Sequence, residues 1–288
     1  MPQKALVLGP TGRFGRHMVQ ALIAAGWQVT GFDRTRDDLI EAARGQNLIV
    51  NGWNPPYPRW QAELPGQIAQ IIAAARTHGA TVLQPGNVYV YGAAAPALFG
   101  PGTPHAASNP LGRLRIRIEH DLKASGLPVI VLRGGDFIDT RPGGNWFERV
   151  IVPGVAKGRF TWLGQRMDAD HAWAFLPDFA RAAVELARAG AGRPGYREVL
   201  FPGFTLTGED LARALEAASG QSLARRHFPW APVRLAAPFW PMGRHILEMR
   251  YLWDKPHRLD GAGLQALLPD FHPTPLEAAM RQAIAWAV

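Results

Sequence analysis

Seven residues near the start of the chain have the types and spacing of a phosphate-binding turn. The segment Gly9-Pro10-Thr11-Gly12-Arg13-Phe14-Gly15 follows a short apolar run and opens a helix-like stretch. The first glycine allows a tight turn, the second lets the backbone approach a pyrophosphate, and the third lets the helix pack closely on the strand. The helix N-terminus, with Thr11, Arg13 and Phe14 around it, supplies backbone N–H groups and the positive end of a dipole. The segment therefore predicts a dinucleotide site.

An acidic residue and two arginines stand where the adenosine end of such a dinucleotide would lie. Asp33 ends the second strand-like run, about 20 residues beyond the glycines, where an acid can bind the ribose hydroxyls of NAD. Arg34 and Arg36 follow, and arginines at this place can bind the 2′-phosphate of NADP. The two signals conflict, and the acid favours NAD only slightly.

The elements that must position these residues alternate between strands and helices in the first half of the chain. Apolar runs at strand length are separated by segments whose apolar residues recur at helical spacing. The predicted strands are residues 4–8, 27–32, 47–50, 81–84 and 128–132, and the predicted helices are residues 13–25, 37–44, 68–77 and 111–124. This alternation predicts an α/β fold, a doubly wound Rossmann sheet of parallel strands with helices on both faces.

The second half has a different pattern. Residues 180–189 and 208–218 are helix-like, and residues 227–257 are rich in aromatic residues and proline. We predict an NAD(P)-binding Rossmann domain in residues 1–140. Residues 141–288 form a mixed region that completes the sheet and adds a small, mostly helical C-terminal cap on the substrate side. The aromatic residues are more typical of core packing than of a ligand pocket; they are Phe228, Trp230, Phe239, Trp240 and Trp253.

The composition argues against several classes of protein and site. The 288 residues are 47% hydrophobic and 19% charged, which is typical of a globular chain. No cysteine is present and the histidines lack metal-ligand spacing, so we expect no disulfide, thiolate nucleophile or metal site. The net charge of +8 comes from dispersed arginines, whereas nucleic-acid binders gather charge on one face or tail. No targeting or membrane-spanning segment is visible, so we expect a cytoplasmic protein without nucleic-acid or membrane partners.

Several segments make the chain resemble the short-chain dehydrogenase/reductase superfamily, in its extended or atypical branch of NAD-dependent epimerase/dehydratase-like proteins. Residues 9–15 have that branch's form of the glycine motif. Residues 81–92 resemble its strand before Tyr-Gly, residues 109–119 its catalytic helix, residues 129–137 its Leu-Arg-x-Gly strand end, and residues 174–180 a late segment with an Asp. The resemblance implies a Rossmann fold, a nicotinamide cofactor and a small carbonyl, alcohol or sugar-type substrate.

One strand of that family has no counterpart in the sequence. The stretch between Asp33 and Val50 is too short for the helix, strand and helix that the family places there. In the usual strand order the third strand lies at the edge of the sheet, so it can be lost without breaking the centre. We therefore predict a sheet that lacks this edge strand and has a thinner wall beside the adenine pocket.

The sequence departs from the family at the catalytic positions. In the family a tyrosine transfers the proton, a lysine four residues later binds the nicotinamide ribose, and a serine polarises the substrate oxygen. The resemblance places Leu111, Arg115 and Asn87 at these positions. Leucine transfers no proton, whereas Arg115 can still bind ribose hydroxyls and Asn87 can still donate a hydrogen bond to a carbonyl.

Two tyrosines could replace the missing proton donor. Tyr89 and Tyr91 flank the end of the strand at residues 81–84, and we predict that both side chains face one side. Tyr91 belongs to the matched Tyr-Gly and is interpreted as structural. Tyr89 is therefore the catalytic candidate, together with Asn87 and Arg115.

The substrate side has two groups of candidates. Residues 51–60 follow a strand at the carboxyl edge of the sheet, and their aromatic and amide residues form either a substrate wall or a loop packed on the cap. These residues are Trp53, Asn54, Tyr57 and Trp60. Asp136 and His171, which are distant in the sequence, are a candidate acid/base pair. Asp178 is interpreted as the N-cap of a helix.

Two functions remain open after this reasoning. The favoured one is an NAD(P)-dependent oxidoreductase or epimerase-like enzyme whose usual tyrosine and lysine are replaced by Leu111 and Arg115. The alternative is a catalytically altered dinucleotide-binding sensor or scaffold protein. In either case we expect a small-molecule ligand. The oligomeric state is undecided between a monomer and a homodimer.

Overall fold

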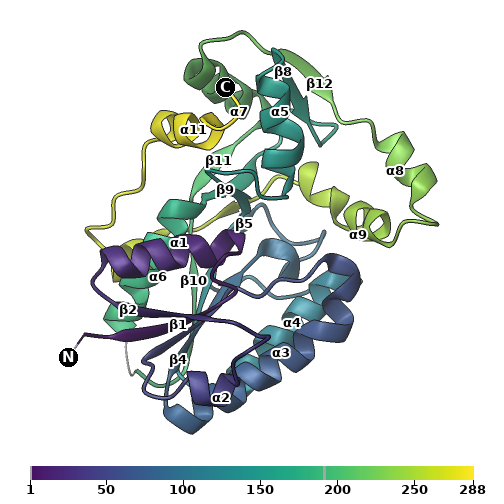
Figure 1. The fold of residues 1–288 in the computed structure, drawn as a ribbon. Helices are drawn as coiled ribbons and strands as arrows, with labels where there is room; N and C mark the ends of the chain where they lie inside the picture. The colour runs from purple at the N-terminus through teal and green to yellow at the C-terminus, as the bar shows by residue number, and fades with distance from the viewer. Residues whose placement is uncertain (1, 191–192) are drawn as a thin grey trace.

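A computed structural model describes residues 2–190 and 193–288. Six parallel strands form the central sheet, and a smaller part of the chain lies beyond its carboxyl edge (Figure 1). In spatial order the strands are β2 (Gln28–Phe32), β1 (Lys4–Leu8), β3 (Leu48–Asn51), β4 (Thr81–Gly86), β6 (Val129–Arg133) and β10 (Tyr196–Leu200). The central strands are buried along nearly their whole length, because helices cover both faces of the sheet. The Rossmann fold predicted from the sequence is confirmed.

The sheet ends at β2, as the sequence predicted. After β2 the chain forms only the short helix α2 (Leu39–Ala42), and β3 then pairs with β1 on the side away from β2. Among the described residues no strand lies beyond β2. The sheet therefore has an open edge at β2.

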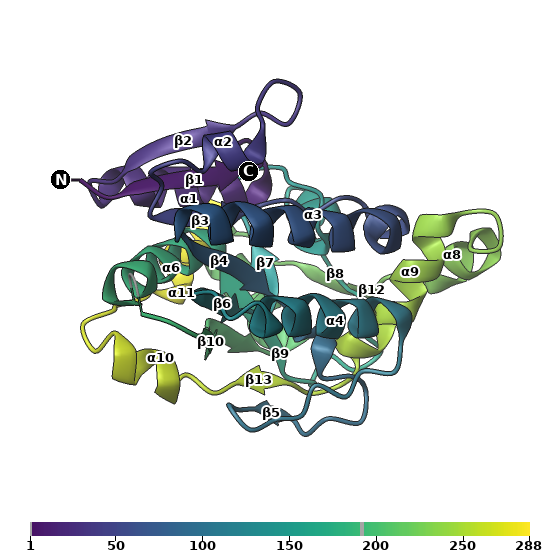
Figure 2. The same cartoon turned by 90° about the horizontal axis from the view of Figure 1, so that it is seen from below.

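The two faces of the sheet carry different pairs of helices. Helices α1 (Arg13–Ala24) and α6 (Leu176–Gly190) pack together on one face, where Phe14, Met18 and Leu22 turn the apolar side of α1 inward. Helices α3 (Tyr57–His78) and α4 (Pro110–Ala124) lie side by side on the other face (Figure 2). The carboxyl ends of the strands thus open between two helical layers.

The cap has its own hydrophobic core and holds two small sheets as well as helices. Its sheets are β7 (Asp136–Ile138), β9 (His171–Phe175) and β11 (Phe204–Leu206), and β8 (Arg159–Trp162) with β12 (Ala224–His227). Its helical elements are η2 (Phe147–Ile151), α5 (Val152–Val155), α7 (Gly208–Ser219), α8 (Trp230–Ala236), α9 (Pro241–Met249), η3 (Arg250–Trp253) and α11 (Leu276–Ile284). The chain is completed by η1 (Val88–Val90), β5 (Leu98–Phe99), β13 (Arg258–Leu259) and α10 (Ala262–Leu267).

Several local predictions were wrong. Helix α3 starts at Tyr57, after Pro56, so the end of the predicted loop at residues 51–60 is helical. Tyr89 lies in the turn η1 rather than on a strand, and its side chain has different neighbours from that of Tyr91. Asp178 lies inside the first turn of α6, where its buried carboxylate accepts hydrogen bonds from Thr274.

The prediction for the aromatic segment at residues 227–257 was wrong in part. Trp230 and Trp253 are buried in the cap core, with 3% of each residue exposed. Phe239 and Trp240 are exposed instead, at 91% and 42%. The aromatic composition of this segment therefore does not arise from core packing alone.

None of the described helices combines the length and the apolar character that crossing a membrane requires.

Candidate active site

The glycine segment forms a tight turn between β1 and α1. Gly9 has φ of 67°, and its carbonyl accepts a hydrogen bond from Gly12 N–H at 3.0 Å. A Cβ on Gly15 would lie 2.0 Å from the Gly9 oxygen, so any larger residue there would force α1 away from the strand. Gly52 closes the turn from the other side, since its own Cβ would lie 2.3 Å from the Leu8 oxygen. Sequence reasoning missed Gly52, although a glycine directly after a buried strand was a usable signal.

The N-terminus of α1 fits an anionic ligand. Gly12 is the N-cap and has no side chain to cap the helix, and the first turn holds no acidic residue. The free N–H groups and the helix dipole therefore favour a phosphate at this end. The side chain of Phe14 points into the core against Phe179, so only its backbone is available to a ligand.

An open cleft of about 590 Å³ extends from this turn to the end of β2. Its volume lies within the range of roughly 300–1,000 Å³ that small-molecule sites occupy. It is lined by residues 9–12, 31–35 and 52–56, with Arg59 and Gln67. The predicted residues Gly9, Thr11, Gly12, Asp33 and Arg34 thus share one cleft with Trp53 and Asn54.

Asp33 is held in place at the open edge of the sheet. Its Oδ1 accepts hydrogen bonds from the hydroxyl of Thr35 at 2.7 Å and from Thr35 N–H at 3.0 Å. The Thr35 hydroxyl lowers the pKa of Asp33 below its usual value, and the backbone bond adds to this effect. The carboxylate is therefore ionised at neutral pH and can accept hydrogen bonds from ribose hydroxyls. Arg34 lines the same cleft, so the cleft has a group for NAD and a group for NADP.

Arg115 joins this cleft to the interior of the site. Its Nη2 donates to the Asn54 Oδ1 at 3.2 Å, and its guanidinium lies over the ring of Trp60 at 4.2 Å. The Arg115 Nε is buried and has no hydrogen-bond partner among the described residues. Burial lowers the pKa of Arg115 below its usual value. A buried donor without a partner is uncommon in folded proteins.

Two tyrosine hydroxyls meet next to Arg115. Tyr57, from the first turn of α3, and Tyr89, from η1, have hydroxyl oxygens 2.6 Å apart. Burial raises the pKa of both hydroxyls, and nearby Asp136 raises both further, while Arg115 opposes the shift. Both tyrosines are therefore neutral at pH 7. Sequence reasoning named both residues but could not predict their contact.

Leu111 and Asn87, which the sequence resemblance matched to a tyrosine and a serine, lie in different surroundings. Leu111 is buried in the core beneath α4, as expected for an apolar residue. The side-chain oxygen of Asn87 accepts from Tyr89 N–H at 3.1 Å, and so caps η1. The amide NH₂ of Asn87 makes no hydrogen bond to the residues that the structure describes. Its donor is thus available to a substrate oxygen.

Asp136 and His171 are brought together, as predicted. The His171 Nε2 lies 2.8 Å from the Asp136 Oδ2, between β9 and β7. The His171 ring is buried and stacks on Trp253 at 4.3 Å, whereas the Asp136 carboxyl is partly exposed. The negative charge of Asp136 also raises the pKa of Tyr57 and of Tyr89.

A buried ionic cluster that sequence reasoning missed lies under the glycine turn. Asp139 is fully buried and bonds to Arg16 and, at 2.9 Å, to the His17 Nε2. Its N–H donates to the Oε1 of Glu148 at 3.2 Å. Burial raises the pKa of Glu148 to about 7, against the opposing charge of Arg13. The Arg13 side chain thus faces the cap rather than the cleft.

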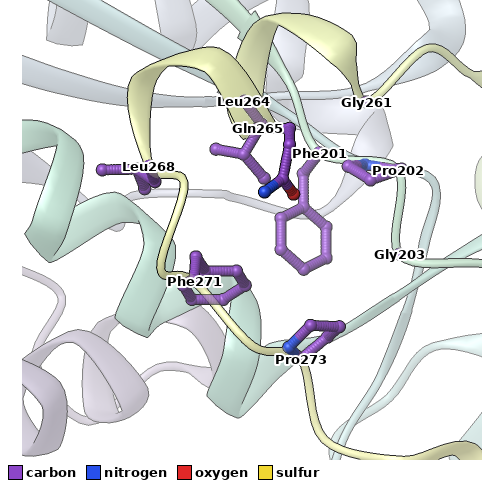
Figure 3. Close-up of a pocket in the computed structure, with 9 residues that line it drawn as sticks. All are labelled: Phe201, Pro202, Gly203, Gly261, Leu264, Gln265, Leu268, Phe271 and Pro273. Atoms are coloured by element: carbon purple, nitrogen blue, oxygen red, sulfur yellow. The ribbon is translucent and has the colours of Figure 1, made fainter.

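Other candidate sites are weaker. Among the described residues no cluster of His, Asp and Glu could hold a metal ion. A second cavity, of about 90 Å³, lies between the loop after β10 and α10 (Figure 3). Its walls are apolar residues, backbone and Gln265, without an ionisable side chain. It therefore offers no acid or base.

Solved structures match this fold over nearly the whole chain, although no protein-family model and no curated protein matches the sequence. MoeE5 in complex with UDP-glucose and NAD gives a TM-score of 0.76 at 16% identity, over 98% of this chain and 98% of that one. The UDP-glucuronic acid 4-epimerase from Bacillus cereus, in complex with NAD, gives 0.76 at 16% identity, over 99% and 96%. This chain has their fold. A nucleoside-diphosphate-sugar epimerase from Pseudomonas aeruginosa has it too, with a TM-score of 0.72 at 20% identity over 99% and 97%.

Proposed function

We propose that this chain is an NAD-binding enzyme of the extended short-chain dehydrogenase/reductase kind. It would interconvert an alcohol and a carbonyl on a sugar-type substrate, as an oxidoreductase or an epimerase/dehydratase-like enzyme. The observation that carries the proposal is the Tyr57–Tyr89 hydroxyl pair beside Arg115, next to the glycine-lined cleft. The solved structures with this fold support the ligand classes, because they are described with NAD and UDP-sugars.

The cleft residues would hold the cofactor along its length. The turn at residues 9–15 would bind the pyrophosphate, Asp33 the adenosine ribose, and Arg115 with Asn54 the nicotinamide ribose. The orphaned Nε of Arg115 supports the last assignment, since a ribose hydroxyl can accept its hydrogen bond. When bound, the nicotinamide supplies the acceptance and donation of hydride.

Tyr89 would transfer the proton that accompanies this chemistry. Because its pKa lies well above 10, its hydroxyl is protonated at neutral pH and is ready to donate to a carbonyl oxygen. Tyr57 can then pass its own proton to Tyr89 across the 2.6 Å contact. The Asn87 amide can donate a second hydrogen bond to the same carbonyl oxygen. His171 would orient Asp136, whose carboxylate can accept a hydrogen bond from a substrate hydroxyl.

Dinucleotide binding is tested first, by thermal shift with NAD⁺, NADH, NADP⁺ and NADPH. A ligand that binds the folded state raises the melting temperature by mass action. We expect the NAD(H) pair to raise it more than the NADP(H) pair. Asp33→Asn should reduce the NAD shift, whereas Asp121→Asn, on the surface of α4, should leave it unchanged. Absence of any shift with all four dinucleotides would refute the cofactor assignment.

Turnover is tested next, on a panel of nucleotide sugars, free sugars and simple carbonyls. We expect Tyr89→Phe to lower kcat by about 100-fold or more, the scale of a lost proton donor. Tyr251→Phe is the matched control, because the Tyr251 hydroxyl is buried without a partner among the described residues. Full activity of Tyr89→Phe would show that another group moves the proton.

A dinucleotide-binding sensor or scaffold remains the second candidate. It is favoured by Leu111, which leaves α4 without a hydroxyl, and by the high pKa of both tyrosines, which makes them poor bases. This function predicts a thermal shift with NAD(H) but no turnover across the whole panel.

A further inference from the structure

The hairpin formed by α8, residues 237–240 and α9 projects from one end of the molecule. Figures 1 and 2 both place α8 and α9 at that end, beyond α3. Three large apolar residues are exposed on its tip, Leu235 at 79%, Phe239 at 91% and Trp240 at 42%. Further exposed apolar residues extend this patch, namely Ala231, Pro232, Ala236, Pro238 and Pro241. An exposed apolar patch of this kind marks a surface that binds something.

The exposed charge of the hairpin is positive, because its acidic residue, Glu248 at the end of α9, is mostly buried and hydrogen-bonded to Asn109 and Leu111. Between residues 217 and 247 the sequence holds four arginines and no acidic residue. Arg225 is paired with Glu209 and Glu216, which lie on α7. Arg226, Arg234 and Arg244 are exposed and have no acidic partner among the described residues. Arg234 on α8, next to Leu235, and Arg244, which bonds to the Ala237 and Pro238 oxygens, therefore place positive charge beside the apolar tip.

Several backbone groups of the tip are hydrogen-bonded within the hairpin. The Arg244 side chain donates to the carbonyl oxygens of Ala237 at 3.0 Å and Pro238 at 2.7 Å. Phe239 N–H donates to the Ala236 oxygen at 3.0 Å. Prolines 238 and 241 have no N–H to satisfy. Such a tip can enter a medium without water at little cost in unpaired backbone groups.

The base of the hairpin is firmly attached to the body. Trp230 is buried in the cap core, and its Nε1 donates to the Leu163 oxygen at 2.7 Å. At the other end, the Oε1 of Glu248 accepts from Leu111 N–H at 2.7 Å. The exposure of the tip is thus a fixed feature of the fold.

We propose that this hairpin binds the surface of a membrane that contains anionic phospholipids. Leu235, Phe239 and Trp240 would insert into the interfacial region, and Arg226 and Arg234 would contact the phosphate groups. A second copy of this chain fits the surface less well, because a two-fold contact between identical hairpins would bring their unpaired arginines together. The proposal is independent of the proposed function, and it revises the expectation that no membrane takes part.

The test is sedimentation of the full chain with lipid vesicles. One set contains phosphatidylcholine alone and the other a mixture of phosphatidylcholine and phosphatidylglycerol. We expect binding to the anionic vesicles that weakens as salt is added, and much weaker binding to phosphatidylcholine. In vesicles with brominated lipid chains, tryptophan quenching should be smaller for Trp240→Phe than for the unmodified protein.

Matched variants localise the contact. Leu235→Ser with Phe239→Ser should weaken vesicle binding by about tenfold or more, since it removes most of the exposed apolar surface of the tip. Ile23→Ser, which removes an apolar side chain 60% exposed on α1, should not. Arg226→Gln with Arg234→Gln should remove the preference for anionic lipid, whereas Arg44→Gln with Arg281→Gln should preserve it. Circular dichroism checks that each variant is folded.

Two results would overturn the proposal. One is no sedimentation with anionic vesicles at low salt. The other is sedimentation that is the same for the Leu235/Phe239 variant and the unmodified protein. A change of oligomeric state in that variant, without any vesicle binding by the unmodified protein, would assign the tip to contact between copies.

Discussion

Glu148 is a buried carboxyl group whose proton is linked to folding. Only 3% of the residue is exposed, and the nearby Asp139 carboxylate opposes its ionisation. One oxygen from each of these carboxyl groups lies within 3.5 Å of the place where a Cβ on Gly143 would be. A protonated Glu148 is therefore compatible with an ionised Asp139, whereas two carboxylates at this separation repel each other.

This arrangement predicts a pH-dependent stability. The folded protein keeps the Glu148 proton to about pH 7, whereas the unfolded chain loses it near pH 4.5. The free energy of unfolding should therefore fall as the pH rises from about 4.5 to 7, by up to about 3 kcal/mol. Glu148→Gln should flatten this dependence and should be more stable than the unmodified protein at pH 8. Urea unfolding across this pH range measures both effects.

A surface carboxyl provides the control for that experiment. Glu277 lies on α11 with 61% of its side chain exposed, so Glu277→Gln should leave the pH dependence unchanged. A Glu148→Gln protein with the same slope as the unmodified protein would mean that Glu148 ionises normally in the fold.

At the scale of elements, the β1–α1 turn contains two glycines, Gly12 and Gly15, that differ in how much space a side chain would have. Gly12 has φ of −69°, which alanine can adopt, and the nearest atom to its Cβ would be the Gly9 oxygen at 3.2 Å. The Cβ of an alanine at position 15 would overlap the Gly9 oxygen at 2.0 Å. The first glycine faces the cleft and the second faces the strand.

Gly12→Ala and Gly15→Ala should therefore differ in how they affect stability and NAD binding. Gly12→Ala should lower the free energy of unfolding by about 1 kcal/mol or less but weaken NAD binding by about tenfold or more, because its methyl group enters the path of the pyrophosphate. Gly15→Ala should lower the free energy of unfolding by about 3 kcal/mol or more, since backbone must move. Calorimetric titration with NAD and urea unfolding separate the two effects. Equal losses of stability in both variants would contradict this division.

The elements were predictable where a local pattern specifies them. The strand runs and the glycine turn follow from periodicity and spacing, because each involves residues close together in the sequence. The loss of the edge strand followed from the family resemblance, by comparison of the lengths between strands. The start of α3 at Tyr57 was missed, since Pro56 and Pro58 there also fit a loop. Phe239 and Trp240 were assigned to the core because composition alone does not show that they lie in the exposed turn between α8 and α9.

Individual candidate residues of the site could be predicted from the sequence, but the contacts between them could not. Tyr57, Tyr89 and Arg115 come from α3, η1 and α4, and their meeting depends on how these elements pack. The contact of Asp136 with His171 was predicted as a candidate acid/base pair, although His171 was assigned to a loop and in fact begins β9. The proximity of Glu148 and Arg13 could not be predicted, since no sequence motif links the two residues.

At the scale of the whole molecule, the cap contributes a side chain that completes a helix of the Rossmann part. Glu248 on α9 accepts hydrogen bonds at its Oε1 from Leu111 N–H at 2.7 Å and from the Asn109 Nδ2 at 2.8 Å. Asn109, the N-cap of α4, makes no capping hydrogen bond with its own side chain. A carboxylate from the cap thus satisfies the N-terminus of α4, the helix that carries Arg115.

This contact predicts that the cap and the Rossmann part support each other. Glu248→Ala should lower the free energy of unfolding by about 1–2 kcal/mol, because it removes the acceptor and the favourable charge at the start of α4. Glu248→Gln keeps one oxygen acceptor and should lose less. Urea unfolding measures the free energy of unfolding of both variants, provided that the m-value is the same as that of the unmodified protein. If the glutamine and alanine variants are equally destabilised, the charge rather than the hydrogen bond holds the two parts together; if neither is destabilised, α4 does not depend on the cap.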